Sequence, residues 1–435
     1  MPMRIELDTM AFAFPQTPLP QVWRVAQRWP APELADVARA AGQATATLCR
    51  DTRIAPGASV AVGVGSRGIW RLPEIVAAVI SELRARGANP FIVPAMGSHG
   101  GATAEGQMAV LASYGITPEA VGAEIRATME VVQVGTLEDG YPVYFDRHAF
   151  TADAVVVINR VKPHTDFHGP VESGPSKMCA IGLGKQQGAL TIHRFGATGL
   201  KEIIPRVARK LVETCPIVGG IAILENQYGR TAEIHALPAQ DMARDPETRL
   251  LERARQLMPS LPFSQIDVLV VDEMGKDISG AGMDTNVIGR VEMPSIPEHE
   301  WNGPYVRCIC VLELTDASHG NAAGLGLADF TTRSLIEKCD FGATFTNSRT
   351  SHEGGVRRLK LPIILEDAPQ CVRAAIATCG RGRPEEVRLV RIRNTERLGL
   401  IEVSEALLSE VPMQAHLEVL EGPVALNLGQ PLPVS

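Results

Sequence analysis

Two hydrophobic patterns alternate along the chain: short β-branched runs and longer stretches with helical spacing. The run ASVAVGVG at 58–65 predicts a buried strand. Apolar residues then recur at helical spacing from Leu72 to Leu83, Gly87 ends that helix, and NPFIVPA at 89–95 predicts the next strand. Elements of these lengths in this order predict a parallel strand–helix–strand crossover.

The alternation continues to the end of the chain and predicts two domains. Other expected elements are an N-terminal hairpin region before a helix at 32–50, a helix opened by 97–103, hairpins at 130–150 and 219–238, helices at 200–212 and 250–257, and strands at 155–158, 266–271 and 305–314. Prolines at 259 and 262 precede a fresh strand–helix pattern. We therefore predict an α/β fold with parallel or mixed sheets flanked by helices. Its domains span 1–262 and 263–435, with the active site in the cleft between them.

Composition narrows the class of protein. The 435 residues carry a net charge of −7, which argues against a nucleic-acid binder. The N-terminus lacks a basic region followed by an apolar core, and no apolar run is long enough to span a bilayer, so we expect a cytoplasmic protein with no membrane partner. The eight cysteines form no CxxC pair, and Cys308 and Cys310 fit one buried face of a strand better than a metal site or a disulfide.

Titratable residues concentrate after the strand at 155–158. The glycine- and proline-rich segment 164–193 carries three of the ten histidines and two lysines, namely His164, His168, His193, Lys177 and Lys185. Imidazole can transfer protons near neutral pH or bind a metal, and a partly desolvated lysine can form a covalent bond. A solvated surface loop is the plain alternative, but the density of these groups favours an active site at the carboxyl end of a strand.

Further candidates follow other strands. His99 lies in the glycine-rich segment after the strand at 89–95, so the topology places it at the same sheet edge as His164. In the second half, the loop at 272–290 carries Lys276, Asp284 and Asn286 directly after a buried strand. These three residues either bind substrate or cap turns, since such residue types also suit turns.

Three segments together resemble the lactate racemase superfamily, whose members depend on a nickel-pincer nucleotide. PHTDFHGPVESGPSK with the later His193 is similar to the family's Pro-His, Ser-Gly-x-x-Lys and nickel-binding histidine pattern. AMGSHGGAT is similar to its Gly-Thr-His segment, and GSRG to its Thr-Arg segment. The resemblance is patchy but runs over most of the chain.

The resemblance implies a racemase or epimerase of a 2-hydroxy acid. The cofactor would be Ni(II) bound by pyridinium-3,5-dithiocarboxylic acid mononucleotide, and it would need cofactor-biosynthesis enzymes for maturation. Lys177 would tether this cofactor and His193 would bind the nickel. The two bases would be His99 and His164. The residues expected to contact the cofactor are Ser66, Arg67, Ser173, Gly174 and Lys185. Arg67 would contact either the cofactor phosphate or the substrate carboxylate, and Lys185 would bind phosphate or act as a competing tether.

The implied mechanism avoids removing the weakly acidic α-proton. Hydride leaves the substrate to give a 2-keto intermediate and returns to the other face. Two stereoisomers present their hydroxyls to opposite sides, so two bases are needed.

The chain also departs from the family pattern. The gap from His164 to Lys177 is long, so His168 is a rival second base, and Val64 replaces an aspartate. The Tyr-Gln-x-x-Lys substrate segment is not recognisable, and the loop with Lys276 occupies its place. Two alternatives are a zinc hydrolase or lyase and a non-catalytic protein that binds a nucleotide or an organic acid.

Overall fold

The computed structural model describes residues 18–51, 54–66, 68–350 and 352–433, and the chain divides into two compact units. The N-terminal unit spans Ala31–Met258, and the C-terminal unit combines Pro259–Ser435 with Met1–Pro30. The boundary therefore lies four residues before the predicted one at 262. The prediction that 1–262 forms one domain is wrong for the segment before Ala31, because its strand pairs with strands of the other unit.

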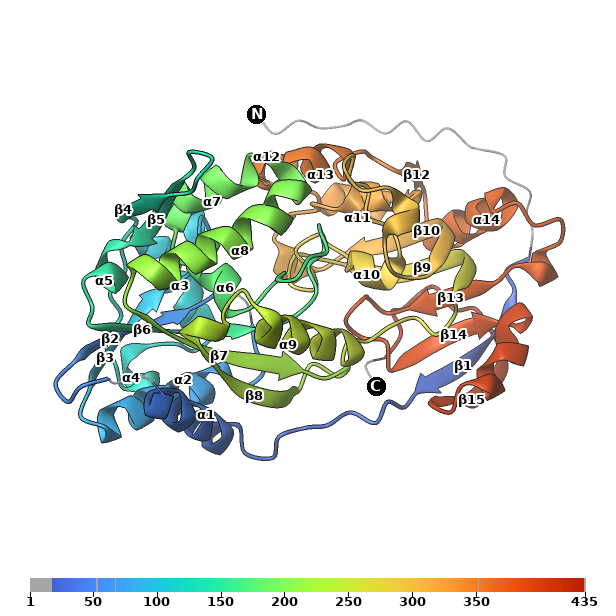
Figure 1. Ribbon diagram of the computed structural model, residues 1–435. Helices are drawn as coiled ribbons and strands as arrows, with labels where there is room; N and C mark the ends of the chain where they lie inside the picture. Colours follow the sequence, from blue (N-terminus) through green and yellow to red (C-terminus); the bar gives the residue numbers. More distant parts are fainter. Residues whose placement is uncertain (1–17, 52–53, 67, 351, 434–435) are drawn as a thin grey trace. The chain divides into compact units, whose positions relative to one another are not determined.

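A mostly parallel sheet forms the centre of the N-terminal unit, with strand order β3-β2-β6-β7-β8 (Figure 1). Its strands are β2 (Ser59–Val64), β3 (Asn89–Pro94), β6 (Ala154–Arg160), β7 (Ile217–Glu225) and β8 (Thr231–Pro238). β2 runs parallel to both β3 and β6, which confirms the predicted crossover, and only β8 is antiparallel to its neighbour. The predicted hairpins are also confirmed: β7 pairs with β8, and β4 (Val131–Thr136) pairs with β5 (Pro142–Asp146).

Helices surround this sheet and bury its β-branched faces. They are α1 (Val37–Asp51), α2 (Leu72–Ala85), α3 (Ala104–Ser113), α4 (Pro118–Val121), α5 (Arg147–Phe150), α6 (Pro175–Lys177), α7 (Lys185–His193), α8 (Gly196–Thr214) and α9 (Asp245–Gln256). The helix predicted at 32–50 begins only at Val37. Val62 and Val156 on the sheet are fully buried and pack in one core with Ile75 and Val79 of α2. Full burial of each such side chain stabilises the folded state by about 1.5–3 kcal/mol.

An eight-stranded mixed sheet forms the C-terminal unit, with order β12-β11-β10-β9-β13-β14-β1-β15. Its strands are β1 (Gln21–Gln27), β9 (Gln265–Met274), β10 (Tyr305–Leu314), β11 (Phe330–Thr332), β12 (Ile363–Leu365), β13 (Leu389–Ile392), β14 (Leu400–Ser404) and β15 (Leu417–Ala425). β1 pairs antiparallel with both β14 and β15, which is where the blue strand meets the red ones in Figure 1. The predicted N-terminal hairpin is thus wrong for β1, and residues 1–17 lie outside the described part of the chain.

Short helices connect the strands of this second sheet. They are α10 (Thr285–Ile288), α11 (Arg333–Lys338), α12 (Phe341–Thr350), α13 (His352–Arg357) and α14 (Ala368–Thr378). Cys308 and Cys310 lie buried in one core with Cys371, as the sequence predicts. The eight cysteines are free thiols in the structure. No helix in the described part of the chain is long and apolar enough to cross a membrane.

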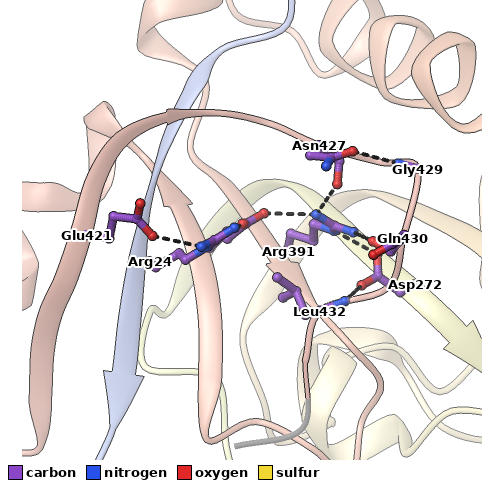
Figure 2. Close-up of polar contacts among 9 residues, drawn as sticks. Arg24, Asp272, Arg391, Glu421, Asn427, Gly429, Gln430 and Leu432 are labelled. Carbon is purple, nitrogen blue, oxygen red and sulfur yellow. Dashed lines mark hydrogen bonds and ion pairs between the residues drawn. The ribbon is translucent and has the colours of Figure 1, made fainter.

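A buried arginine joins this sheet to the C-terminal segment (Figure 2). Arg391 of β13 is 2% exposed and bonds to Asp272 at 2.7 Å and Glu402 at 3.0 Å. It also donates to the carbonyl oxygens of Asn427 at 2.7 Å and Gln430 at 2.6 Å. The guanidinium thus compensates two buried carboxylates and also holds the backbone of the segment 427–430 against the sheet.

Candidate active site

Three neighbouring strands deliver the candidate residues to one edge of the N-terminal sheet. β3, β2 and β6 are adjacent and parallel, so the segments after their carboxyl ends meet at the same edge. His99 follows β3, Ser66 follows β2, and His164 follows β6. A hydrogen bond between the Ser66 hydroxyl and Nδ1 of His99 joins the first two segments directly. Arg67 lies outside the described residues.

The lysine segment folds back against this edge through a tight turn. Gly174 has a φ of +139°, which favours glycine, and a Cβ there would lie only 3.1 Å from Val161 Cγ2. Ser173 Oγ donates to the carbonyl oxygen of Arg160 at 3.3 Å. Ser173 and Gly174 therefore shape the turn that leads into α6 and Lys177. Their contact with a cofactor stays a prediction.

His164, Lys177 and His193 lie within electrostatic reach of one another. Burial is the main cause that lowers the pKa of His164 well below its usual value, and the positive charge of Lys177 lowers it further. Asp166 opposes the shift, whereas His193 and Lys162 add to it. His164 is therefore neutral at physiological pH, the form that can exchange a proton with a substrate hydroxyl.

The two nitrogens of His164 have different roles in this conformation. Nδ1 accepts the Asp166 N–H at 3.1 Å, so the neutral ring carries its proton on Nε2. The ring of Phe167 packs against the imidazole with centroids 4.6 Å apart. His164 is thus held by its neighbours in sequence and presents an N–H donor.

His168 occupies a different setting, and the structure does not support it as a second base. Its Nδ1 lies 3.3 Å from both carboxylate oxygens of the fully buried Glu172. Its Nε2 atom is buried, so a substrate oxygen cannot reach it in this conformation. Glu172 also accepts the backbone N–H of His164 at 2.7 Å and of Gly169 at 3.0 Å. His168 and Glu172 therefore hold the loop that carries His164.

Lys185 is a structural residue, which corrects its prediction as a phosphate ligand or tether. The side chain is fully buried, and its ammonium lies 3.2 Å from the equally buried Asp146 carboxylate. It also donates to Gln107 Oε1 at 3.0 Å and to the carbonyl oxygen of Pro94. Three acceptors inside the protein leave no donor directed at a phosphate in solvent.

The predicted substrate residues belong to the C-terminal unit. Asp284 caps α10, accepting the Asn286 backbone N–H at 3.0 Å and its side-chain amide at 2.9 Å. The Lys276 ammonium donates to the carbonyl oxygen of Gly280, and its backbone N–H donates to Ser318 Oγ at 2.8 Å. The turn-capping reading therefore accounts for Asp284 and Asn286, and a substrate role for the three stays a prediction.

The sequence did not predict the structural role of two buried carboxylates, those of Glu172 and Glu247. Glu172 reads as a turn acid between a proline and a glycine, and Glu247 reads as an ordinary acid in the first turn of a helix. Glu247 accepts the Ser176 N–H at 3.0 Å and its hydroxyl, directly beside Lys177. No local pattern marks either residue, because the N–H groups that each carboxylate accepts are brought together only by the fold of the backbone.

Comparisons with known proteins agree with this architecture. Residues 60–201 match the family model described as the lactate racemase N-terminal domain. The structure is similar to the lactate racemase apoprotein from Thermoanaerobacterium thermosaccharolyticum, at 12% identity and a TM-score of 0.51 over 86% of this chain and 98% of that one. A crystal structure of a Thermotoga maritima protein also matches at 12% identity, with a TM-score of 0.48 over 82% of this chain and 96% of that one. No curated protein matches the chain.

These matches confirm the predicted two-domain α/β fold and the resemblance found in the sequence. The matched domain contains His99, His164, Lys177 and His193 together. Residues 60–201 of this chain accordingly match the lactate racemase N-terminal domain, and the fold of the chain is similar to that of a lactate racemase apoprotein.

Proposed function

We propose that the protein is a racemase or epimerase of a 2-hydroxy acid that depends on a nickel-pincer nucleotide. One observation carries the proposal: a lactate racemase N-terminal domain brings His164 into electrostatic reach of both Lys177 and His193. Maturation in the cytoplasm by cofactor-biosynthesis enzymes is part of the proposal.

The donor set of the chain fits this cofactor. Among the described residues, no group of three or more His, Cys, Asp or Glu side chains could hold a metal ion. Lys177 offers an amine for the covalent tether, and His193 offers one imidazole to nickel. A cofactor that brings its own sulfur and carbon donors would need only one ligand from the protein, and His193 would supply it. A zinc hydrolase would instead need about three such side chains around one metal ion, a group that the described residues do not form.

His99 and His164 would move the hydroxyl proton. When bound, the cofactor supplies a hydride acceptor for the substrate's hydroxyl-bearing carbon. Nδ1 of His99 is held by Ser66, and if Nδ1 carries the ring proton, Nε2 has a lone pair that accepts the hydroxyl proton.

His164 begins as a hydrogen-bond donor to the substrate oxygen, whereas His99 begins as the proton acceptor. The Nε2–H of His164 donates to the substrate oxygen, because Nδ1 accepts the Asp166 N–H. To accept a proton from the other stereoisomer, Nε2 must lose its hydrogen and Nδ1 must gain one, so the ring has to release the Asp166 N–H and change tautomer. The two directions of the reaction therefore use the two histidines unequally.

Lactate is not the proposed substrate. Val64 replaces the family's aspartate, and the Tyr-Gln-x-x-Lys segment is not recognisable. A panel of enantiopure 2-hydroxy acids, incubated with enzyme made alongside the cofactor-making enzymes, identifies the substrate by chiral chromatography.

The same assay in D₂O tests the reaction type. Hydride return keeps the original hydrogen on the hydroxyl-bearing carbon, so the inverted product should contain no solvent deuterium there. Incorporation of deuterium at that carbon would show proton abstraction and contradict the proposal.

A further inference from the structure

Helix α9 bonds to both segments that carry the candidate catalytic groups. Glu247 bonds to Ser176 in the lysine turn, Thr248 Oγ1 donates to the carbonyl oxygen of Pro170 at 3.0 Å, and Arg255 pairs with Glu172 in the histidine loop. At about 100° per residue, these three side chains fall within roughly one quadrant of the helix. Leu251 lies between them and is buried in one core with Val161, where β6 ends.

The first contact fixes the lysine turn. Glu247 is 1% exposed, and its carboxylate accepts the Ser176 N–H at 3.0 Å, the Ser176 hydroxyl, and the Ala243 N–H at 2.8 Å. A Cβ on Gly174 would lie 3.0 Å from Glu247 Oε1, so the backbone of the turn lies directly against the carboxylate. Three donors stabilise this buried charge and fix the residue that precedes Lys177.

The second contact fixes the histidine loop. Glu172 is fully buried and collects the backbone N–H groups of His164 and Gly169 together with His168 Nδ1. The Arg255 guanidinium pairs with the same carboxylate and compensates its charge. Without that cation, Glu172 would be a buried charge balanced only by neutral donors.

We propose that α9 is the positioning element of this site, with Glu247 and Arg255 setting the lysine turn and the histidine loop in a fixed register. Both residues act through a neighbour, Ser176 and Glu172, and neither touches the substrate. The reason for the register rests on the proposed function, because a tethered cofactor and a proton-transfer residue must meet at one substrate. The contacts themselves do not depend on that function.

The lysine half of the proposal is tested in the cofactor-free full-length protein. The rate of Lys177 acylation by a small amine reagent is measured by peptide mass spectrometry, relative to Lys210 as an internal reference. Glu247→Gln should raise this relative rate severalfold, because the amide removes the negative charge and replaces one of the two acceptor oxygens with an NH2 donor. Glu252→Gln, which changes an exposed acid of the same helix, should leave it unchanged.

The histidine half uses amide hydrogen exchange of the 162–173 peptide. Arg255→Gln should speed exchange of this peptide severalfold, and Arg249→Gln, at an exposed position of α9, should not. The effects should also stay local: Glu247→Gln acts mainly on Lys177, and Arg255→Gln mainly on the loop.

A purely structural role would lower the melting temperature of both variants but leave the Lys177 rate and the loop exchange at wild-type values below the transition. That result overturns the proposal. If Glu247→Gln does not fold, Ser176→Ala removes only the hydroxyl bond and should raise the Lys177 rate to a smaller extent; no change would count against the proposal. Neither readout requires cofactor, so a protein that never forms a Lys177 adduct would refute the proposed function while leaving this test intact.

Discussion

Replacing Arg391 with methionine should be one of the most damaging single changes to the C-terminal unit. Methionine keeps much of the side-chain volume but removes the cation and its donors. Asp272 and Glu402, at 3% and 1% exposure, would then be left as two buried carboxylates without their shared cation. The carbonyl oxygens of Asn427 and Gln430 would lose their donors at the same time.

The cost follows from the burial of the pair. Removing one partner of a buried ion pair typically costs about 3–5 kcal/mol of unfolding free energy. Each lost bond to a backbone carbonyl adds about 1 kcal/mol if no water replaces it. With both carbonyl bonds lost, we therefore expect a loss of about 5–7 kcal/mol for Arg391→Met.

Arg24 provides a matched control in the same cluster. It bonds to Glu402 at 3.3 Å and to Glu421 at 2.7 Å, but its side chain is 39% exposed. Exposed pairs of this kind contribute about 0–1 kcal/mol, so Arg24→Met should cost far less than Arg391→Met. Urea titration followed by circular dichroism measures both, with an unchanged slope showing that the unfolding transition is comparable.

The penalty should also depend on pH. Burial raises the pKa of Asp272 to about 6 from 3.8, although the charge of Arg391 opposes the shift. A folded pKa above the unfolded one means that the native state binds more protons, so this group's contribution to stability falls as pH rises through that window. Without Arg391 the folded pKa rises further, and protonation relieves the buried charge.

The difference between wild type and Arg391→Met should therefore be smaller at about pH 5 than at about pH 8. A loss no greater than that of Arg24→Met, or a difference that grows as pH falls, would refute this account of the cluster.

Two further predictions concern the histidines of the candidate site. At equal cofactor loading, His164→Ala should lower turnover about 10²–10⁴-fold, whereas His168→Ala should lower stability more than turnover per folded molecule. The reverse order, measured as kcat beside melting temperature, would restore His168 as the base. His193→Ala should lose nickel by elemental analysis while its circular dichroism spectrum stays native, because His193 contributes little to the core; full nickel occupancy in that variant would place the ligand elsewhere.

Local sequence patterns predicted much of the N-terminal unit. They failed where the position of a strand depends on pairing with strands far away in the sequence. The crossover from β2 through α2 to β3 follows from the residues of those elements alone. β1 could not be placed, because its partners Leu400–Ser404 and Leu417–Ala425 lie near the other end of the chain. A short strand carries no local signal of its register with such distant strands.

In the candidate site, the sequence identified several of the residues, but the role of each depends on contacts that form only in the folded protein. Gly-Leu-Gly-Lys reads as a loop that presents Lys185 to an anion, yet Asp146 and Gln107 capture the ammonium inside the protein. Strand order predicted that His99 and His164 lie at one sheet edge, and the density of histidines and lysines at 164–193 favoured an active site there. The roles of Lys177 and His193 came from the resemblance. Glu172 and Glu247 were not predicted, since their function lies in accepting N–H groups that only the folded backbone brings together.

The covalent state of Lys177 tests the central claim most directly. Protein produced together with the cofactor-making enzymes is analysed by intact mass, by peptide mapping and for nickel content. The proposed function predicts one cofactor adduct per chain, located on Lys177 and absent from Lys177→Ala, with nickel present in equal amount. An adduct on another lysine, or an active enzyme with no adduct and no nickel, would contradict it.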